Sequence, residues 1–434
     1  MMKNSVILCF LLVVSPMLVW ASDKTLLEIN RIVADKSSYT IQESTTPGGS
    51  LDEDQAIRIS LSNNLALKAL FERFGVDRSE IIEGSLLKNP KLSYSSRKSN
   101  ESNTKRDNEW EVKVDVMDLL LWPLKLQAKH RQLKFAEFMV ASQVLDFIKD
   151  VRINFYRLQE AQAVMDSYKD EMTAQQTILD ISQGMFKAGN SNILQWQKAQ
   201  VAFAESKLGY LDAKRDLAIA RENLNLLLGL PEGQEDWQVD GQFKDIASSE
   251  PKLAELQPLA GDNRLEIVIA KAQVGILSNK LTMARAGLLP EVDVGYDQER
   301  EAPGDTLKGP VLETDIPIFN FNQAGMLRYE SLLSTAKINV PAIEALVNKE
   351  VNVAYQQLMT ARLKVVDLKE ALPLYQEITR QTLYNYNFML KDVFSVIEAK
   401  RMQLKAQEEF ARAMSEYWQA RAELEHAVGH SLTN

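Results

Sequence analysis

The sequence has a single cysteine, Cys9, which lies inside an apolar stretch near the N-terminus. If that stretch is removed on export, no thiol remains. Disulfides, a cysteine nucleophile and a lipid-bearing N-terminal cysteine are then excluded. Stability would have to come from packing or assembly. Prolines and glycines are also few, 13 and 18 in 434 residues, and they cluster at segment ends. Their scarcity elsewhere leaves room for long unbroken helices.

Recognisable catalytic constellations are absent as well. No Ser-His-Asp set and no Gly-rich phosphate loop can be assembled. His426 and His430 have the spacing of two ligands on one helix face, but Gly429 favours a frayed helix end instead. We therefore expect no catalytic residues, no cofactor and no metal. A formal net charge of −9 without a basic face also argues against a nucleic-acid partner.

The N-terminus has the features of a secretory signal. Lys3 supplies the positive start, an apolar stretch follows, and Ala21 offers a small residue for cleavage before Ser22. The apolar stretch is too short for a membrane helix, and no other run of about 20 apolar residues exists. We predict that residues 1–21 are a signal peptide and that the protein is exported.

The most informative feature that is present is an internal repeat with an offset of 200 residues. The paired landmarks are Gly75 and Gly275, Pro90 and Pro290, Ala199 and Ala399, and Gly229 and Gly429. Each copy contains an amphipathic segment, a Leu-rich turn, two alternating stretches and two helical runs. The two halves should therefore form equivalent elements.

Long helices are predicted in each copy. Residues 124–183 contain neither Gly nor Pro and lie between Pro123 and Gly184. A helix of this length would extend roughly 90 Å. Its apolar residues recur at helical spacing among many polar ones, which is typical of an antiparallel coiled coil. After a turn capped by Asn190 or Ser191, a second helix should return to residue 228.

The second copy repeats this arrangement with two differences. Its first helical run, 326–383, is interrupted by Pro341 and Pro373, which predict kinks. After a turn at 384–392, its second run covers 393–428. The fold is thus predicted to be mainly α, with long antiparallel helical hairpins and a small β part.

Strict alternation predicts two strands in each copy, at about 90–99 and 109–118 and at about 290–299 and 310–318. One face is apolar and the other is charged. This pattern fits a solvated sheet, and it also fits membrane strands with lipid on one side and water on the other. Export combined with very long helices favours the membrane interpretation. Since a small barrel needs about eight strands and open edges are not tolerated in lipid, several chains would share one barrel.

Several motifs resemble those of TolC-type outer-membrane efflux proteins. They are residues 51–67, 84–92 and 286–292, together with the helical turn 186–191 that is followed by Ala199-Gln200. The resemblance covers about 51–429. It implies a homotrimer with a twelve-stranded barrel in the outer membrane and a long helical barrel in the periplasm. The tips of that barrel would meet a periplasmic adaptor protein, which joins them to an inner-membrane pump.

The resemblance also implies site residues. The adaptor-docking tips would comprise Phe186, Gly189, Asn190, Ser191, Tyr386, Met389, Leu390 and Lys391. The candidate channel constriction comprises Asp392, Ser395 and Glu398. Two departures matter: Met389 stands where a glycine is expected, and Glu398 alone carries over the acidic residues that relatives place after the second tip.

The predicted organisation has six parts. They are the signal peptide 1–21, an N-terminal extension 22–50, repeat 1 at 51–230, a linker 231–263, repeat 2 at 264–430 and a tail 431–434. The predicted function is a passive outer-membrane exit duct of a tripartite efflux or type I secretion system, without enzymatic activity. The alternatives are a periplasmic coiled-coil scaffold or adaptor with a soluble sheet and, less favoured, an enzyme.

Overall fold

The computed structural model describes residues 21–41, 49–98, 106–230, 237–239, 241–286, 291–300, 305–315 and 318–432. The predicted signal segment lies outside these residues apart from Ala21. The elements are α1 (Ala21–Ser37), β1 (Gly49–Ser50), α2 (Glu53–Asn63), α3 (Leu65–Glu83), β2 (Lys91–Arg97), β3 (Asp107–Asp115), α4 (Val116–Lys187), α5 (Ile193–Leu228), β4 (Trp237–Gln238), α6 (Leu253–Asn263), α7 (Leu265–Ala286), β5 (Val292–Arg300), β6 (Thr306–Thr314), α8 (Gln323–Asn387) and α9 (Val393–Val428).

The chain forms two compact units, and each unit takes segments from both sequence repeats. The first comprises Met1–Leu70, Ala141–Arg264 and Ala345–Asn434, and the second comprises Phe71–Val140 and Leu265–Glu344. The units do not follow the repeats because α3, α4 and α8 are each long enough to contribute to both. The division into repeats remains a prediction about duplication.

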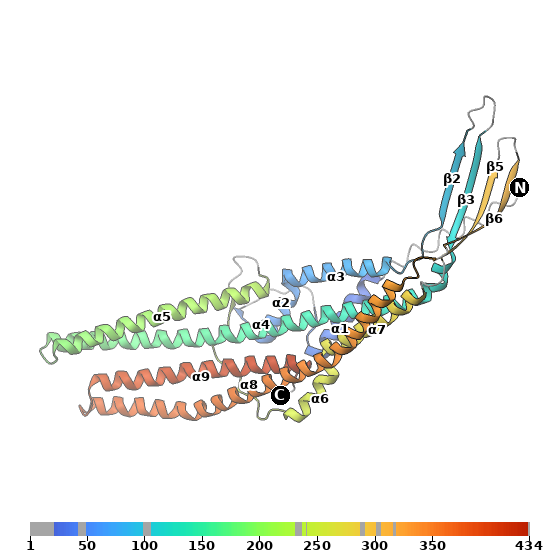
Figure 1. Ribbon diagram of the computed structural model, residues 1–434. Helices are drawn as coiled ribbons and strands as arrows, with labels where there is room; N and C mark the ends of the chain where they lie inside the picture. Colours follow the sequence, from blue (N-terminus) through green and yellow to red (C-terminus); the bar gives the residue numbers. More distant parts are fainter. Residues whose placement is uncertain are drawn as a thin grey trace. The chain divides into compact units, whose positions relative to one another are not determined.

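Two helical hairpins, α4–α5 and α8–α9, lie side by side in the first unit, with α4 against α9 (Figure 1). The Tyr156 ring of α4 stacks on Trp418 of α9, with ring centroids 5.6 Å apart. Ser415 of α9 donates a hydrogen bond to the Tyr156 carbonyl over 3.1 Å. These buried contacts fix the register between the two hairpins.

A buried ion network joins α2, α4 and α9. The Arg152 guanidinium lies 2.6 Å from a Glu53 oxygen and 2.5 Å from a Glu425 oxygen. The Tyr156 hydroxyl donates to Glu53 over 2.6 Å. Burial by itself would lower the pKa of Arg152, but the carboxylates of Glu425 and Glu53 raise it overall. The network is therefore satisfied only when all its members are present.

Two helices at corresponding positions of the predicted repeats end in the same way. Gly229 ends α5 and Gly429 ends α9, each in the left-handed conformation, at φ +63° and +73°. A Cβ on Gly229 would lie 2.8 Å from the backbone of Asn63, and one on Gly429 would lie 3.0 Å from the backbone of Asn263. Each glycine thus permits both a helix end and the close approach of an equivalent chain segment.

The N-terminal extension and the linker contain structure that the sequence analysis missed. The extension forms α1, whose Ile29 and Val33 are fully buried. The linker forms α6 and the short strand β4, and β4 pairs in parallel with β1 through Gly49 and Trp237. Packing of their apolar side chains against the rest of the chain stabilises these segments, since most of the stability of a helix in a protein comes from such packing.

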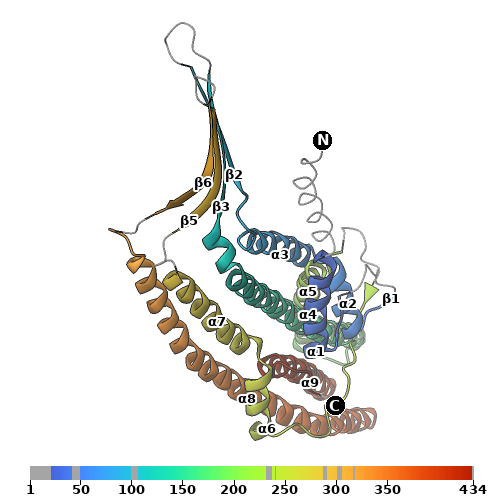
Figure 2. The same ribbon diagram turned by 90° about the vertical axis from the view of Figure 1, so that its right-hand side faces the viewer.

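The second unit contains a four-stranded antiparallel sheet of order β2-β3-β5-β6 (Figure 2). The two predicted hairpins pair with each other through β3 and β5. The register therefore aligns Leu92, Val112, Tyr296 and Pro310 in one row, and Ser93, Glu111, Asp297 and Gly309 in the next. Apolar rows face one side of the sheet and polar rows face the other, as predicted.

Two strand boundaries differ from the prediction. β3 ends at Asp115 and not at 118, because Asp115 accepts a hydrogen bond from the Asp118 N–H over 2.8 Å and caps the start of α4. β6 covers Thr306–Thr314 and not 310–318, because its pairing with β5 begins at Thr306 opposite Arg300. Residues 316 and 317 lie outside the described residues.

Helix boundaries differ as well. α4 begins at Val116 and ends at Lys187, so that Pro123 and Gly184 lie inside it and do not bound it. α8 continues through Pro341 and Pro373 without a break, and the kinks expected at these prolines stay a prediction. Packing of a long helix against its neighbours can offset the backbone hydrogen bond that an internal proline removes. None of the helices in the described part of the chain is both long and apolar enough to cross a membrane.

Candidate functional site

The first predicted tip is the turn between α4 and α5. The N–H of Gly189 donates to the Phe186 carbonyl over 3.0 Å, and that of Asn190 donates to the Met185 carbonyl over 2.9 Å. Gly189 has a φ of +75°, so the turn uses the conformation that glycine adopts most readily. Asn192 caps α5 by accepting from the N–H of Gln195 over 2.9 Å, whereas the predicted caps were Asn190 or Ser191.

The second tip reproduces this turn with other side chains. The N–H of Met389 donates to the Tyr386 carbonyl over 2.9 Å, and that of Leu390 donates to the Asn385 carbonyl over 2.9 Å. Met389 adopts a φ of +58°, the left-handed conformation of its counterpart Gly189. Methionine in place of glycine thus leaves the turn geometry unchanged. The left-handed conformation of Met389 costs roughly 1–2 kcal/mol of backbone strain.

The two tips expose different surfaces. Phe186 is half-buried because it stacks on Trp196, with ring centroids 5.3 Å apart. At the second tip, Met389 is 94% exposed and Leu390 is 73% exposed. Tyr386 is half-buried. Ser191 is half-buried at the first tip, and Gly189, Asn190, Phe388 and Lys391 are exposed. A cluster of exposed apolar side chains at a helix turn is typical of an interface.

The predicted constriction residues separate into two groups. Asp392 is the N-cap of α9, and its carboxylate accepts hydrogen bonds from the Ser395 hydroxyl and N–H, over 2.7 and 2.8 Å. These two bonds hold the pKa of Asp392 below its usual value. Asp392 and Ser395 therefore have a defined role at the start of α9. A role for them in a constriction stays a prediction.

Glu398 lies one turn further along α9, at a groove that the sequence analysis did not find. The groove has a volume of about 580 Å³ and runs between α4, α5 and α9. We name it the α4–α5–α9 groove and define it by Tyr168, Glu171, Gln175, Glu205, Glu398, Arg401, Lys405 and Glu408. These residues come from distant parts of the sequence, so no local sequence motif predicts the groove.

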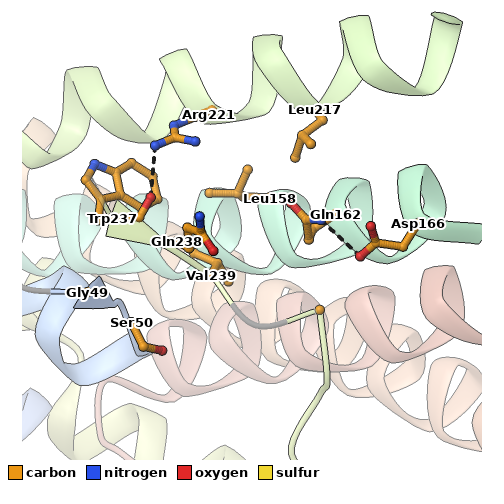
Figure 3. A pocket seen from close by; sticks show the side chains of 11 residues that line it. Gly49, Ser50, Leu158, Gln162, Asp166, Leu217, Arg221, Trp237, Gln238 and Val239 are labelled. Atoms are coloured by element: carbon orange, nitrogen blue, oxygen red, sulfur yellow. Dashed lines mark hydrogen bonds between the residues drawn. The ribbon is translucent and has the colours of Figure 1, made fainter. Parts of the chain in front are cut away.

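A second cavity, of about 720 Å³, lies beside the β1–β4 pair (Figure 3). Arg221 of α5 donates to the Trp237 carbonyl over 2.9 Å, and its guanidinium lies 4.8 Å from the centre of the Trp237 ring. Gln162 and Asp166 of α4 line the other end and are hydrogen-bonded over 3.0 Å. The contacts of Trp237 attach the linker to the hairpin unit. An isolated tryptophan in a polar linker was the available signal.

The sheet of the second unit has one uncovered apolar face. Its side chains are 42–70% exposed and are Leu92, Tyr94, Trp110, Val112, Val114, Val294, Tyr296 and Leu312. The opposite face carries ion pairs, including Lys91 with Asp293 at 3.1 Å and Lys113 with Glu313 at 2.6 Å. The sheet therefore presents an apolar surface to one side and a charged surface to the other.

Comparison with known proteins agrees with this geometry. Residues 89–230 match the model of the outer membrane efflux protein family. About a third of the chain is therefore similar to outer membrane efflux proteins. The matched segment contains the first strand pair and the first helical hairpin. No curated protein matches the chain significantly.

Solved structures share the fold over nearly the whole chain. The structure of CusC aligns with a TM-score of 0.72 at 16% identity, covering 92% of this chain and 96% of that one. The Campylobacter jejuni CmeC outer membrane channel aligns with 0.70 at 15% identity, covering 91% of each chain. The open state of the Neisseria gonorrhoeae MtrE outer membrane channel aligns with 0.66 at 14% identity, covering 90% and 95%.

These findings confirm the predicted resemblance and the mainly helical fold with a small β part. The structural alignments, at such low identities, establish the fold. The family match and the similar channels support a location in the outer membrane, with a periplasmic portion.

Proposed function

We propose that this protein is the outer-membrane exit duct of a tripartite efflux or type I secretion system. Three copies would complete one twelve-stranded barrel in the outer membrane. Their helical hairpins would form a periplasmic conduit whose tips dock to an adaptor protein, which in turn binds an inner-membrane pump. The duct would be passive, with no catalytic step in this chain and the energy supplied by the pump.

The main support for this proposal is the four-stranded sheet, which has one apolar and one charged face and two unpaired edges. β2 and β6 are the outer strands of the sheet, and neither pairs with a further strand among the described residues. Backbone groups at an open edge cannot be left in lipid, and four strands are too few to enclose a pore. Copies of the same chain offer the simplest partners for both edges, because a closed symmetric ring joins β2 of one copy to β6 of the next.

The exposed second tip supports the docking part of the proposal. Met389 and Leu390 are exposed on a turn in which the N–H groups of both residues and of Phe388 donate hydrogen bonds to backbone carbonyls, so the turn holds them in a defined position. The Lys198 ammonium of α5 lies 5.9 Å from the centre of the Phe394 ring of α9, which links the two hairpins near their tips. An adaptor would thus meet an apolar cluster held on a firm base.

Extraction and electrophoresis test the assembly. We expect the protein to require detergent for release and to run as a trimer that dissociates on heating. A protein that is fully released in the periplasmic fraction would refute the duct and favour a coiled-coil scaffold or adaptor. Pairing of β2 in one copy with β6 in the next can be tested by introducing one cysteine on each strand and looking for a disulfide between subunits. Because Cys9 is the only native cysteine, no other thiol interferes once the signal is removed.

The docking tip is tested by photo-crosslinking to the periplasmic adaptor of the same organism. A photoreactive residue at Leu390 should crosslink the adaptor, and the same residue at Leu363, which is 61% exposed on α8, is the control. Met389→Asp and Gly189→Asp should reduce the crosslink at unchanged protein level. Adaptor capture that is equal at both positions, or unaffected by both substitutions, would show that the tips do not dock.

A further inference from the structure

The α4–α5–α9 groove has an unusual chemical composition for a space between helices. Its volume of about 580 Å³ is within the range of small-molecule sites, about 300–1,000 Å³. Each of the three helices contributes a glutamate: Glu171 from α4, Glu205 from α5 and Glu398 from α9. Glu408 of α9 adds a fourth carboxylate. The acids thus surround the groove and do not follow one helix face.

The positive charges in the groove do not balance these acids. Four glutamates against Arg401 and Lys405 leave two formal negative charges. Arg401 lies 4.0 Å from Glu171, and Arg412 from outside the lining pairs with Glu408 at 2.5 Å. Glu205 and Glu398 have no ion-pair partner among the described residues. Two carboxylates on opposite helices are therefore available to a ligand.

Gln175 provides an independent indication of a ligand. Its side chain lines the groove from α4 and is only 3% exposed, yet its Oε1 atom accepts no hydrogen bond within the described part of the chain. A buried amide oxygen without a donor is costly, and native proteins rarely leave one. A ligand group that satisfies the Gln175 oxygen must donate a hydrogen bond. The carboxylates of Glu205 and Glu398 also favour a ligand with hydrogen-bond donors.

Tyr168 adds an aromatic wall. Its ring packs against Gly209 of α5, where a Cβ would lie 2.7 Å from a ring carbon. Burial raises the pKa of Tyr168, and the Glu408 and Glu171 carboxylates raise it further, so the neutral phenol is retained. Burial likewise raises the pKa of Glu171; Arg401 opposes this, and Glu408 and Glu205 reinforce it. A bound cation would relieve this repulsion.

We propose that the α4–α5–α9 groove binds a small organic dication of the aliphatic diamine class. One ammonium would pair with Glu205 or Glu398, the other would pair with Glu171, and an N–H would be donated to Gln175 Oε1. The site is formed within one chain, and its occupation requires neither the adaptor nor the assembled duct.

The probe is 1,4-diaminobutane, titrated calorimetrically into the purified full chain in detergent. We expect saturable binding of about one ligand per chain. 1-Aminobutane, which has a single ammonium, should bind at least about tenfold more weakly because one charge pair is lost. Magnesium ions at the same ionic strength control for non-specific screening.

Three variants locate the site. Gln175→Leu removes the unpartnered acceptor at similar volume, and Glu205→Gln combined with Glu398→Gln removes the two unpaired charges. Both should weaken binding by about tenfold or more. Glu222→Gln, on the exposed side of α5 and outside the groove, should bind like the wild type. Helical circular dichroism checks folding, and the single variant Glu398→Gln serves if the double variant does not fold, since Glu398 is exposed.

The proposal is overturned by any of three results. These are no saturable binding of 1,4-diaminobutane to the wild type, equal binding of 1-aminobutane, or unchanged binding in folded Gln175→Leu and glutamate variants. None of these results bears on the duct itself, whose test is extraction and trimer formation.

Discussion

A single charge on the apolar face of the sheet tests the membrane interpretation most directly. Val112 lies near the middle of β3, opposite Leu92 of β2 and Tyr296 of β5. A nine-residue strand rises roughly 30 Å, and it spans roughly 23 Å of membrane when tilted by about 40°. Val112→Arg would therefore place a guanidinium close to the bilayer midplane.

The expected cost separates the two interpretations. In lipid, arginine at the midplane of a barrel destabilises by about 2–4 kcal/mol, which is about thirtyfold or more in the folding equilibrium. In a water-exposed sheet the same change would cost less than about 0.5 kcal/mol, because Val112 is already 45% exposed in the single chain. The amount of heat-dissociable trimer in the outer-membrane fraction measures the difference, and we expect a large loss.

The matched control places the same residue on the opposite face. Ser93 neighbours Glu111 in the next row, and its hydroxyl donates to that carboxylate over 3.1 Å. Ser93→Arg should accumulate near the wild-type level, since its guanidinium meets a carboxylate in water. If Val112→Arg gives as much trimer in the outer membrane as Ser93→Arg, the apolar face does not contact lipid and the proposed assembly is wrong.

Three further predictions concern stability, each measured by thermal unfolding followed through helical circular dichroism. Gly229→Ala and Gly429→Ala should each lower the free energy of unfolding by at least about 1–2 kcal/mol, because both glycines have a left-handed conformation and close contacts. Gly75→Ala, with open space around it, should raise the free energy of unfolding by up to about 1 kcal/mol. Equal effects at the three positions would contradict the close contacts of Gly229 and Gly429. Arg152→Met should cost about 3–5 kcal/mol because Glu53 loses its cation and Glu425 keeps only Arg421, at 3.4 Å, whereas Arg380→Met, at a fully exposed pair, should have a much smaller effect. Adding Glu53→Gln and Glu425→Gln should recover part of the loss, and no recovery would refute the network. Asp392→Ala should cost about 1 kcal/mol at neutral pH. Because folding lowers the pKa of Asp392, this contribution is present above the unfolded value of 3.8 and is lost as the pH falls through the folded value, so the gap to the wild type should close in acid. A gap independent of pH would contradict the cap.

Local signals account for the elements that were predicted well. α9 covers the predicted residues 393–428, and α5 ends at the predicted residue 228. Both ends are set by glycine in the left-handed conformation, and α9 begins at a capping aspartate, so neighbouring residues contain all the information needed. The early start of α4 also has a local signal, the Asp115 cap, although Pro123 alone predicts a later start.

The errors arose where a distant segment decides the outcome. β6 lies four residues earlier than predicted because its register with β5 selects the paired residues, and alternation alone does not define where pairing begins. α1 exists because Ile29 and Val33 are covered by the rest of the unit. At the predicted site, the sequence found the two turns, but it could not show that Met389 would adopt the backbone conformation of Gly189.

The 200-residue offset, the long helices, the two-faced strands and the family resemblance can all be predicted from the amino-acid sequence alone, because these features recur at fixed spacing along the chain. By contrast, the joining of the two strand pairs into one sheet and the grouping of carboxylates depend on tertiary packing. Asp392 became a helix cap, while Glu398 joined Glu171 and Glu205 around a groove. The physical reason is that burial and charge depend on neighbours in space, and residues of three helices become neighbours only when those helices pack.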